Sequence, residues 1–120
     1  MSTPEEIFNE ATEAATAAVA AEIARKPEDP NAFDCGFAWV NVKPARGPFV
    51  NWCKKKVQEA GGHFQAMQYG DRDSYEGGWK FWKPGGFNGQ SIRIHEAGSK
   101  AFSEVLKKHN INCYWSSRLD

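Results

Sequence analysis

The stretch GFAWVNVKPARGPF, residues 36–49, decides the fold of this 120-residue chain. Aromatic and β-branched residues over 37–42 predict a strand, which Lys43-Pro44 ends. Pro48 suits the first position of a helix, and apolar residues recur at helical spacing from there to the glycine pair at 61–62. The stretch therefore predicts a strand, a tight turn and a helix of about 13 residues.

The segments that follow continue this alternation of strands and helices. Strands are predicted over 63–69 and 79–83, and the glycine-rich hairpin loop between them makes them antiparallel. A short alternating piece over 91–94 leads into a helix from about residue 96, and a last strand is predicted over 111–115. From residue 34 the order is β-α-β-β-α-β, which is typical of ferredoxin-like α+β folds. We expect a four-stranded antiparallel sheet with two helices on one face.

An acidic helix is predicted ahead of this domain, over residues 4–26. Ser2 or Thr3 can cap it, Pro4 suits its first position, and its apolar stripe is rich in alanine. Because a proline-rich linker follows, we divide the chain into an N-terminal helix with its linker, 1–30, and a ferredoxin-like domain, 31–120. The stripe needs a surface, so the helix can pack on the body, cover the other sheet face, or pair with a second copy in a homodimer.

The composition is typical of a globular protein. Hydrophobic residues make up 41% of the chain and charged residues 25%. No apolar run reaches the roughly 18 residues of a membrane span, and the acidic N-terminus does not read as a secretion signal, so we expect a cytoplasmic location and no membrane partner. Three cysteines without CxxC spacing argue against a disulfide framework and a zinc site. We expect no metal and no cofactor.

Charge is divided unevenly along a chain whose formal net charge is zero. Residues 1–33 carry seven acidic and two basic side chains, a net charge of −5. Residues 34–120 carry thirteen basic and eight acidic side chains, a net charge of +5. A basic body favours an anionic partner, or attraction between the two parts of the chain.

The sheet face away from the helices is the candidate binding surface. Alternation along the first strand turns Phe37, Trp39 and Asn41 toward that face. On the strand over 79–83, either Trp79, Phe81 and Lys83 or Lys80 and Trp82 share it. A face of aromatic and basic residues resembles the stacking surface of RNA-recognition-motif domains, where aromatic rings stack bases and cations hold phosphates. The alternative is that the N-terminal helix covers these aromatic residues as part of the core.

Arg46 extends the candidate site, because it precedes a helix N-terminus, where its guanidinium can bind phosphate.

No catalytic residue is predicted, since the three histidines and three cysteines form no spacing signature. The element order and Arg46 are similar to those of acylphosphatases, which keeps a small phosphate-binding hydrolase as a third function. The predicted ligand-binding residues are Phe37, Trp39, Asn41, Arg46, Trp79, Phe81, Lys83 and Arg93.

Three stretches, residues 36–49, 96–102 and 113–120, resemble small uncharacterised proteins of tailed bacteriophages. The resemblance covers most of residues 35–120 and implies a host-directed or nucleic-acid-linked role in the host cytoplasm. We predict a non-enzymatic binding module for single-stranded nucleic acid or a nucleotide. The alternative is a phage-type inhibitor or adaptor that binds a host protein, for which the five tryptophans supply interface anchors.

Overall fold

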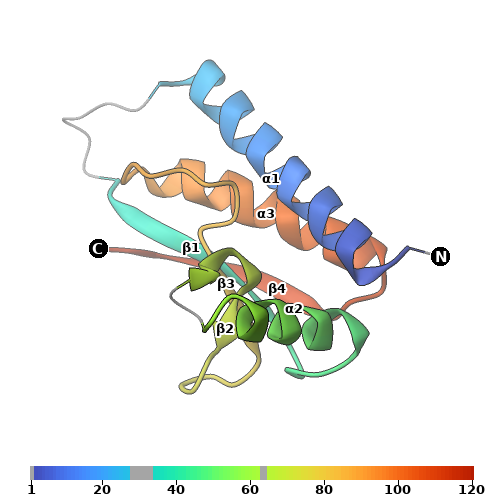
Figure 1. Ribbon diagram of the computed structural model, residues 1–120. Helices are drawn as coiled ribbons and strands as arrows, with labels where there is room; N and C mark the ends of the chain where they lie inside the picture. The colour runs from blue at the N-terminus through green and yellow to red at the C-terminus, as the bar shows by residue number, and fades with distance from the viewer. Residues whose placement is uncertain (1, 28–33, 63–64) are drawn as a thin grey trace.

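The computed structural model describes residues 2–27, 34–62 and 65–120. In these ranges three α-helices accompany a four-stranded antiparallel sheet, which confirms the predicted α+β class (Figure 1). The helices are α1 (Pro4–Arg25), α2 (Pro48–Glu59) and α3 (Ile92–Lys108), with a short 3-10 helix, η2 (Met67–Tyr69). The strands are β1 (Gly36–Val42), β2 (Asp71–Arg72), β3 (Trp79–Trp82) and β4 (Cys113–Leu119).

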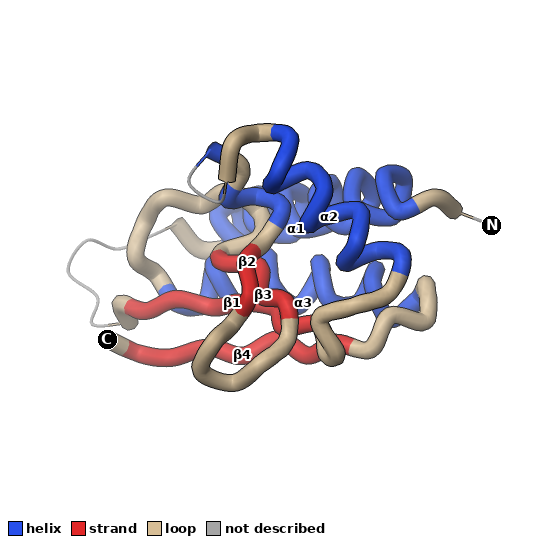
Figure 2. The backbone as a smooth tube through the Cα atoms, turned by 60° about the horizontal axis from the view of Figure 1, so that its bottom comes forward, coloured by secondary structure: helices blue, strands red, loops and turns tan. Residues whose placement is uncertain are grey.

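The four strands lie in the order β2-β3-β1-β4. The connection through α2 therefore passes over β3, and the connection through α3 passes over β1. Figure 2 shows the strands in one layer, with the helices above and behind them. The core lies between the two layers and includes Val40, Val42, Phe81, Phe102 and Leu106.

The prediction of a second strand over 63–69 is wrong. Residues 63–64 lie outside the described residues, and η2 occupies the end of this stretch, so that β2 has only two residues. The Tyr69 carbonyl accepts a hydrogen bond from Trp79 Nε1 at 2.8 Å, and Gly70 then turns the chain with a φ of 91°. The regular ferredoxin-like arrangement is therefore not matched, because its second strand is reduced and a third helix joins the helix layer.

The short alternating piece over 91–94 is not a strand either. Only Ser91 pairs with the sheet, through an isolated antiparallel bridge to Cys35. The Ile92 amide donates to the Asp34 carbonyl at 2.8 Å, and α3 begins at that residue. Helix α3 thus starts four residues before the predicted position, because the apolar residues at 92 and 94 belong to its helical pattern rather than to a strand.

Helix α1 begins as predicted. Thr3 caps it, and Thr3 and Glu6 form a reciprocal capping box. The helix lies alongside α3 on the helix side of the sheet, away from the opposite sheet face (Figure 1). Val19 of α1 packs closely on α3, because a methyl group added at Gly98 would lie 3.0 Å from Val19 Cγ2. The buried residues of α1 are Ile7, Phe8, Ala11, Ala15 and Val19.

Two groups of opposite charges join α1 to α3. Glu10 accepts hydrogen bonds from Lys108 and, at 2.8 Å, from His109 Nε2. Farther along, Glu22 Oε1 lies 3.0 Å from Arg93 Nη1. Some of the opposite charges of the acidic segment and the basic body therefore pair with each other within one chain.

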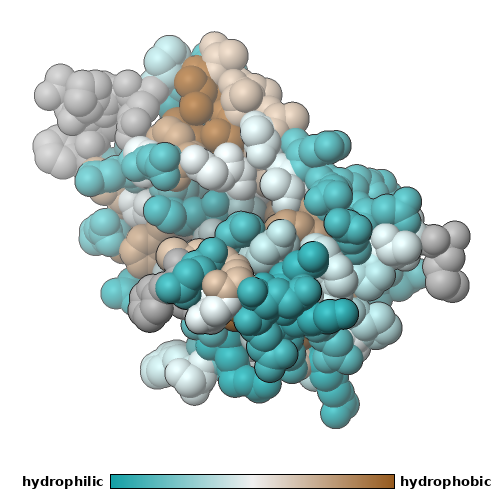
Figure 3. All heavy atoms as spheres, viewed as in Figure 1, coloured by the Kyte–Doolittle hydropathy of each residue, from teal (hydrophilic) through white to brown (hydrophobic). Residues whose placement is uncertain are grey.

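The surface seen in Figure 3 has an apolar part and a hydrophilic part. Its apolar part gathers over the C-terminal half of α1, whereas hydrophilic side chains cover α2. Ile23 of α1 is 36% exposed. Among the described residues, no helix is long and apolar enough to cross a membrane.

Candidate functional site

Strand register decides which side chains share the face opposite the helices. Trp39 stands directly opposite Trp82 in the β1–β3 pair, and Asn41 stands opposite Lys80. Directly opposed residues point to the same side of a sheet, so Lys80 and Trp82 belong to the open face. The predicted placement of Trp79 and Phe81 on this face is wrong, because both residues lie in the core and are only 5% and 2% exposed.

Three aromatic rings meet on the open face. The ring centroids of Phe37 and Trp82 are 5.0 Å apart, those of Trp39 and Trp82 are 5.6 Å apart, and those of Phe37 and Trp39 are 6.0 Å apart. Lys80 Nζ lies 4.2 Å from the Trp82 centroid and 4.8 Å from the Trp39 centroid, within cation–π range. We call these four residues the aromatic face.

The three rings of the aromatic face are partly exposed to solvent. Trp82 is 42% exposed, and Phe37 and Trp39 are half-buried. Trp39 Nε1 is buried without a hydrogen-bond partner among the described residues. Because α1 packs on the other side of the sheet, these rings are not covered by it. The alternative in which the acidic helix covers the aromatic residues is wrong.

Strand β4 adds polar groups beside the rings. Its register places Arg118 opposite Phe37 and Ser116 opposite Trp39. Tyr114, opposite Asn41, donates a hydrogen bond from its hydroxyl to Glu76 at 2.6 Å. That hydrogen bond, with burial and the Glu76 charge, raises the pKa of Tyr114 to about 12.

Asn41 has a structural role. It is fully buried, and its Nδ2 donates to the Gly77 carbonyl at 3.0 Å. The loop that covers it is held by Asp73, whose carboxylate accepts from the amides of Tyr75 and Glu76. The hydrogen bond from the Glu76 amide is the main cause that lowers the pKa of Asp73. The positive charge of Lys80 lowers this pKa further, by a smaller amount.

The other predicted cations are dispersed. Arg46 is exposed in the turn before α2, at the opposite end of β1 from Phe37. Arg93 donates to Glu22 and to the carbonyls of Lys26 and Pro27, so it anchors the end of α1. Lys83 follows β3, turns the chain with a φ of 46°, and lines a pocket together with Phe8, Phe81 and Phe102.

Two of the three cysteines, Cys53 and Cys113, are buried. Burial raises the pKa of the Cys53 thiol to about 12 and also raises the pKa of Cys113. A thiol needs its thiolate form to act as a nucleophile, so both cysteines are poor candidates. In the part of the chain that is described, no three His, Cys, Asp or Glu side chains are grouped to hold a metal ion.

Sequence reasoning therefore identified two of the three rings, Phe37 and Trp39, and missed Trp82 and Lys80 as members of the site. The strand over 79–83 carries large residues on both faces, so its alternation left two assignments open. The register with β1 selects between them. Comparisons with protein-family models, curated proteins and solved structures found no match, so the bacteriophage resemblance stays a prediction and the function rests on this surface.

Proposed function

We propose that the chain is a non-enzymatic binding module that stacks the bases of single-stranded nucleic acid on the aromatic face. The observation that carries this proposal is the cluster of Phe37, Trp39 and Trp82 with the Lys80 ammonium over two of its rings. Bases of any identity offer a flat π surface to such rings, so stacking is tolerant of sequence. RNA-recognition-motif domains use a sheet face opposite two helices in this way, which supports the proposal by analogy.

Cations on the same face supply the phosphate contacts. Lys80 lies between the rings, Arg118 flanks Phe37, and Lys43 Nζ lies 5.4 Å from the Tyr114 ring centroid. When a base stacks on Trp82, Lys80 leaves the indole surface and pairs with a phosphate. Asp73 lies 3.8 Å from Lys80 and partly neutralises it, so we expect modest affinity.

The test is a fluorescence titration with labelled (dT)12 and (U)12 at low salt. We expect binding in the micromolar range by the parent chain, and a loss of about 5- to 150-fold for Trp82→Ala, which corresponds to 1–3 kcal/mol for one stacked base. Trp82→Phe keeps an aromatic ring and is expected to retain most of the affinity. Tyr75→Ala is the control, because Tyr75 is 95% exposed on a loop outside the cluster.

Absence of micromolar binding contradicts this proposal, as does an unchanged affinity after Trp82→Ala.

The second candidate, a protein-binding inhibitor or adaptor, is favoured by a separate observation. Asp71, Asp73 and Glu76 border one end of the face, which gives it mixed charge. Protein interfaces use large exposed aromatic residues within such mixed surroundings, and their affinity depends less on salt.

A further inference from the structure

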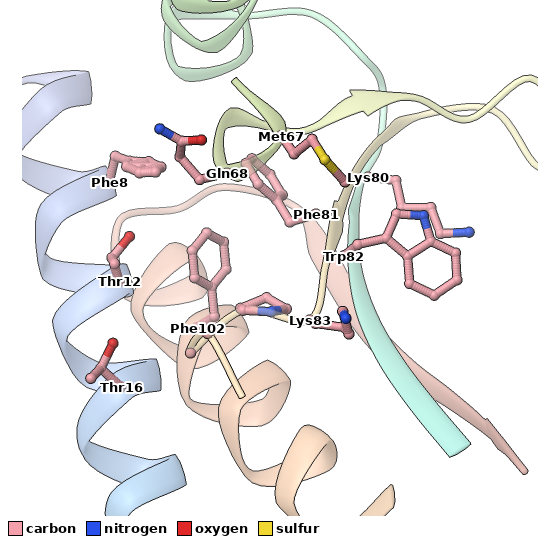
Figure 4. Close-up of a pocket in the computed structure, with 13 residues that line it drawn as sticks. Phe8, Thr12, Thr16, Met67, Gln68, Lys80, Phe81, Trp82, Lys83 and Phe102 are labelled. Carbon is pink, nitrogen blue, oxygen red and sulfur yellow. The ribbon is translucent and has the colours of Figure 1, made fainter. Parts of the chain in front are cut away.

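A pocket lies on the helix side of β3, apart from the aromatic face. Its volume is about 290 Å³, and the rings of Phe8, Phe81 and Phe102 turn toward one another within it (Figure 4). These rings come from α1, β3 and α3, so the pocket exists only when the two helices pack on the sheet. Figure 4 shows Thr12 and Thr16 projecting toward the rings from α1.

The rim of the pocket carries polar groups that face solvent. Thr12 and Thr16 are exposed, and both can donate a hydrogen bond. Lys83 lines the pocket and is exposed, and it has no carboxylate within ion-pair distance among the described residues. A cation without a partner beside an apolar cavity favours an occupant that carries one negative charge.

The backbone of β3 contributes a further donor at this place. Lys83 N bonds to Ala38 O at 3.1 Å, so in an antiparallel ladder the Trp82 N–H points away from β1. The first residue of β2, Asp71, stands opposite Lys80, and no described strand pairs with the outer side of Trp82. Lys80 and Trp82 line the pocket although their side chains point away from it in Figure 4, which leaves their backbone to form this wall.

The open edge is too short for a peptide strand. After Trp82 the chain turns at Lys83, whose φ is 46°, and the loop that follows is held against α1. A methyl group added at Gly85 would lie 2.6 Å from Val19 Cγ2. An added strand would therefore find one residue to pair with, whereas strand addition normally uses several. A small molecule suits this enclosure better than an extended peptide.

We propose that this pocket binds a small aromatic or alkyl carboxylate. Its apolar body lies among Phe8, Phe81 and Phe102, and its carboxylate accepts from Lys83 and the Trp82 N–H at the β3 wall of the pocket. The pocket and the aromatic face lie on opposite sides of β3. The inference is therefore independent of nucleic-acid binding, and either one can fail alone.

The test uses 4-phenylbutyrate as the probe and 4-phenylbutan-1-ol as its uncharged counterpart, each added to the full-length ¹⁵N-labelled chain and followed by amide chemical shifts. We expect the carboxylate to bind with a Kd of about 1 mM, the affinity usual for a ligand of this size, with shifts gathered around Phe81 and Phe102. The alcohol is expected to bind several-fold more weakly.

Three variants test whether the probe binds in the pocket. Thr16→Phe fills the cavity from an exposed position of α1 and is expected to weaken carboxylate binding at least tenfold. Ala17→Phe adds the same ring at the neighbouring exposed position and is expected to leave binding unchanged. Lys83→Gln is expected to reduce carboxylate affinity to that of the alcohol while leaving alcohol binding unchanged.

The folded spectrum of each variant is checked before titration. The proposal is overturned if the parent chain shows no shifts up to about 10 mM carboxylate, ten times the expected Kd. Equal effects of the two phenylalanine variants, or equal binding of acid and alcohol, also overturn it. Binding of the extended peptide acetyl-Thr-Asp-Thr-Leu-Thr-amide in place of both small molecules would assign the pocket to a protein partner instead.

Discussion

Trp39 and Trp82 stand directly opposite each other in the β1–β3 pair, with their ring centroids 5.6 Å apart and the Lys80 ammonium over both rings. A directly opposed pair lies on one face of a sheet by geometry alone. The two indoles and the cation therefore form a single surface for stacking and phosphate contact.

Salt dependence is the first prediction from this surface. If Lys80, Arg118 and Lys43 each neutralise one phosphate, the logarithm of the binding constant should fall with the logarithm of salt with a slope of about −2. Binding of (dT)12 is then expected to weaken roughly 20-fold between about 50 and 200 mM salt. Fluorescence titrations at four salt concentrations measure the slope. A slope near zero would instead favour the protein-binding alternative.

Phe8 tests whether α1 belongs to the core. Phe8 is 5% exposed, and its ring centroid is 4.9 Å from that of Tyr69 and 6.4 Å from that of Phe102. Phe8→Ala is expected to lower the free energy of unfolding by about 3–5 kcal/mol in a urea titration. Ile23→Ala on the same helix should cost under about 1 kcal/mol, because Ile23 is 36% exposed. Equal costs would show that α1 does not share the core.

Gly77 and Gly78 form a matched pair for the loop over Asn41. Both have positive φ, 81° and 87°, so alanine at either position costs about 1–2 kcal/mol of backbone strain. At Gly77 an added methyl group meets no atom within 4 Å, whereas at Gly78 it meets Asn41 Oδ1 and lies 2.9 Å from the Val42 carbonyl. Gly78→Ala is expected to be the more destabilising by roughly 1–3 kcal/mol. Thermal or urea unfolding of both variants measures the difference, and similar values would contradict the packing of this loop.

The lowered pKa of Glu22 predicts that acid destabilises the folded chain. The pKa of Glu22 is lowered from 4.5 to about 2, mainly by its hydrogen bonds with Arg25 and also by those with Arg93. A carboxylate whose pKa is lower in the folded chain contributes stability above about pH 4.5 that is lost as the pH falls toward 2. Glu22→Gln should therefore flatten the pH dependence of the unfolding free energy in this window.

Glu13→Gln is the control for this measurement, because Glu13 is exposed on the same helix and forms no ion pair with another described residue. We expect its profile to follow that of the parent chain. An unchanged profile for Glu22→Gln would mean that the contacts of Glu22 do not link acid to stability.

Several elements could be predicted from local sequence because their causes are local. The start of α1 follows from Thr3, Pro4 and Glu6, which act within one helical turn. Strand β1 and helix α2 follow from the pattern of residues 36–49 in the same way. The face of Phe37 and Trp39 also follows, because alternation along one strand needs only the two-residue period.

Only the tertiary structure decided the second strand, the position of α1 and the other half of the aromatic face. The stretch ending at Tyr69 is drawn out of the sheet by the Trp79 indole, a contact ten residues away. Helix α1 takes its place through Phe8, Glu10 and Glu22, whose partners on α3 follow some 70 to 100 residues later. Both faces of β3 carry large side chains, so only its pairing with β1 could show that Trp82, and not Trp79, lies beside Trp39.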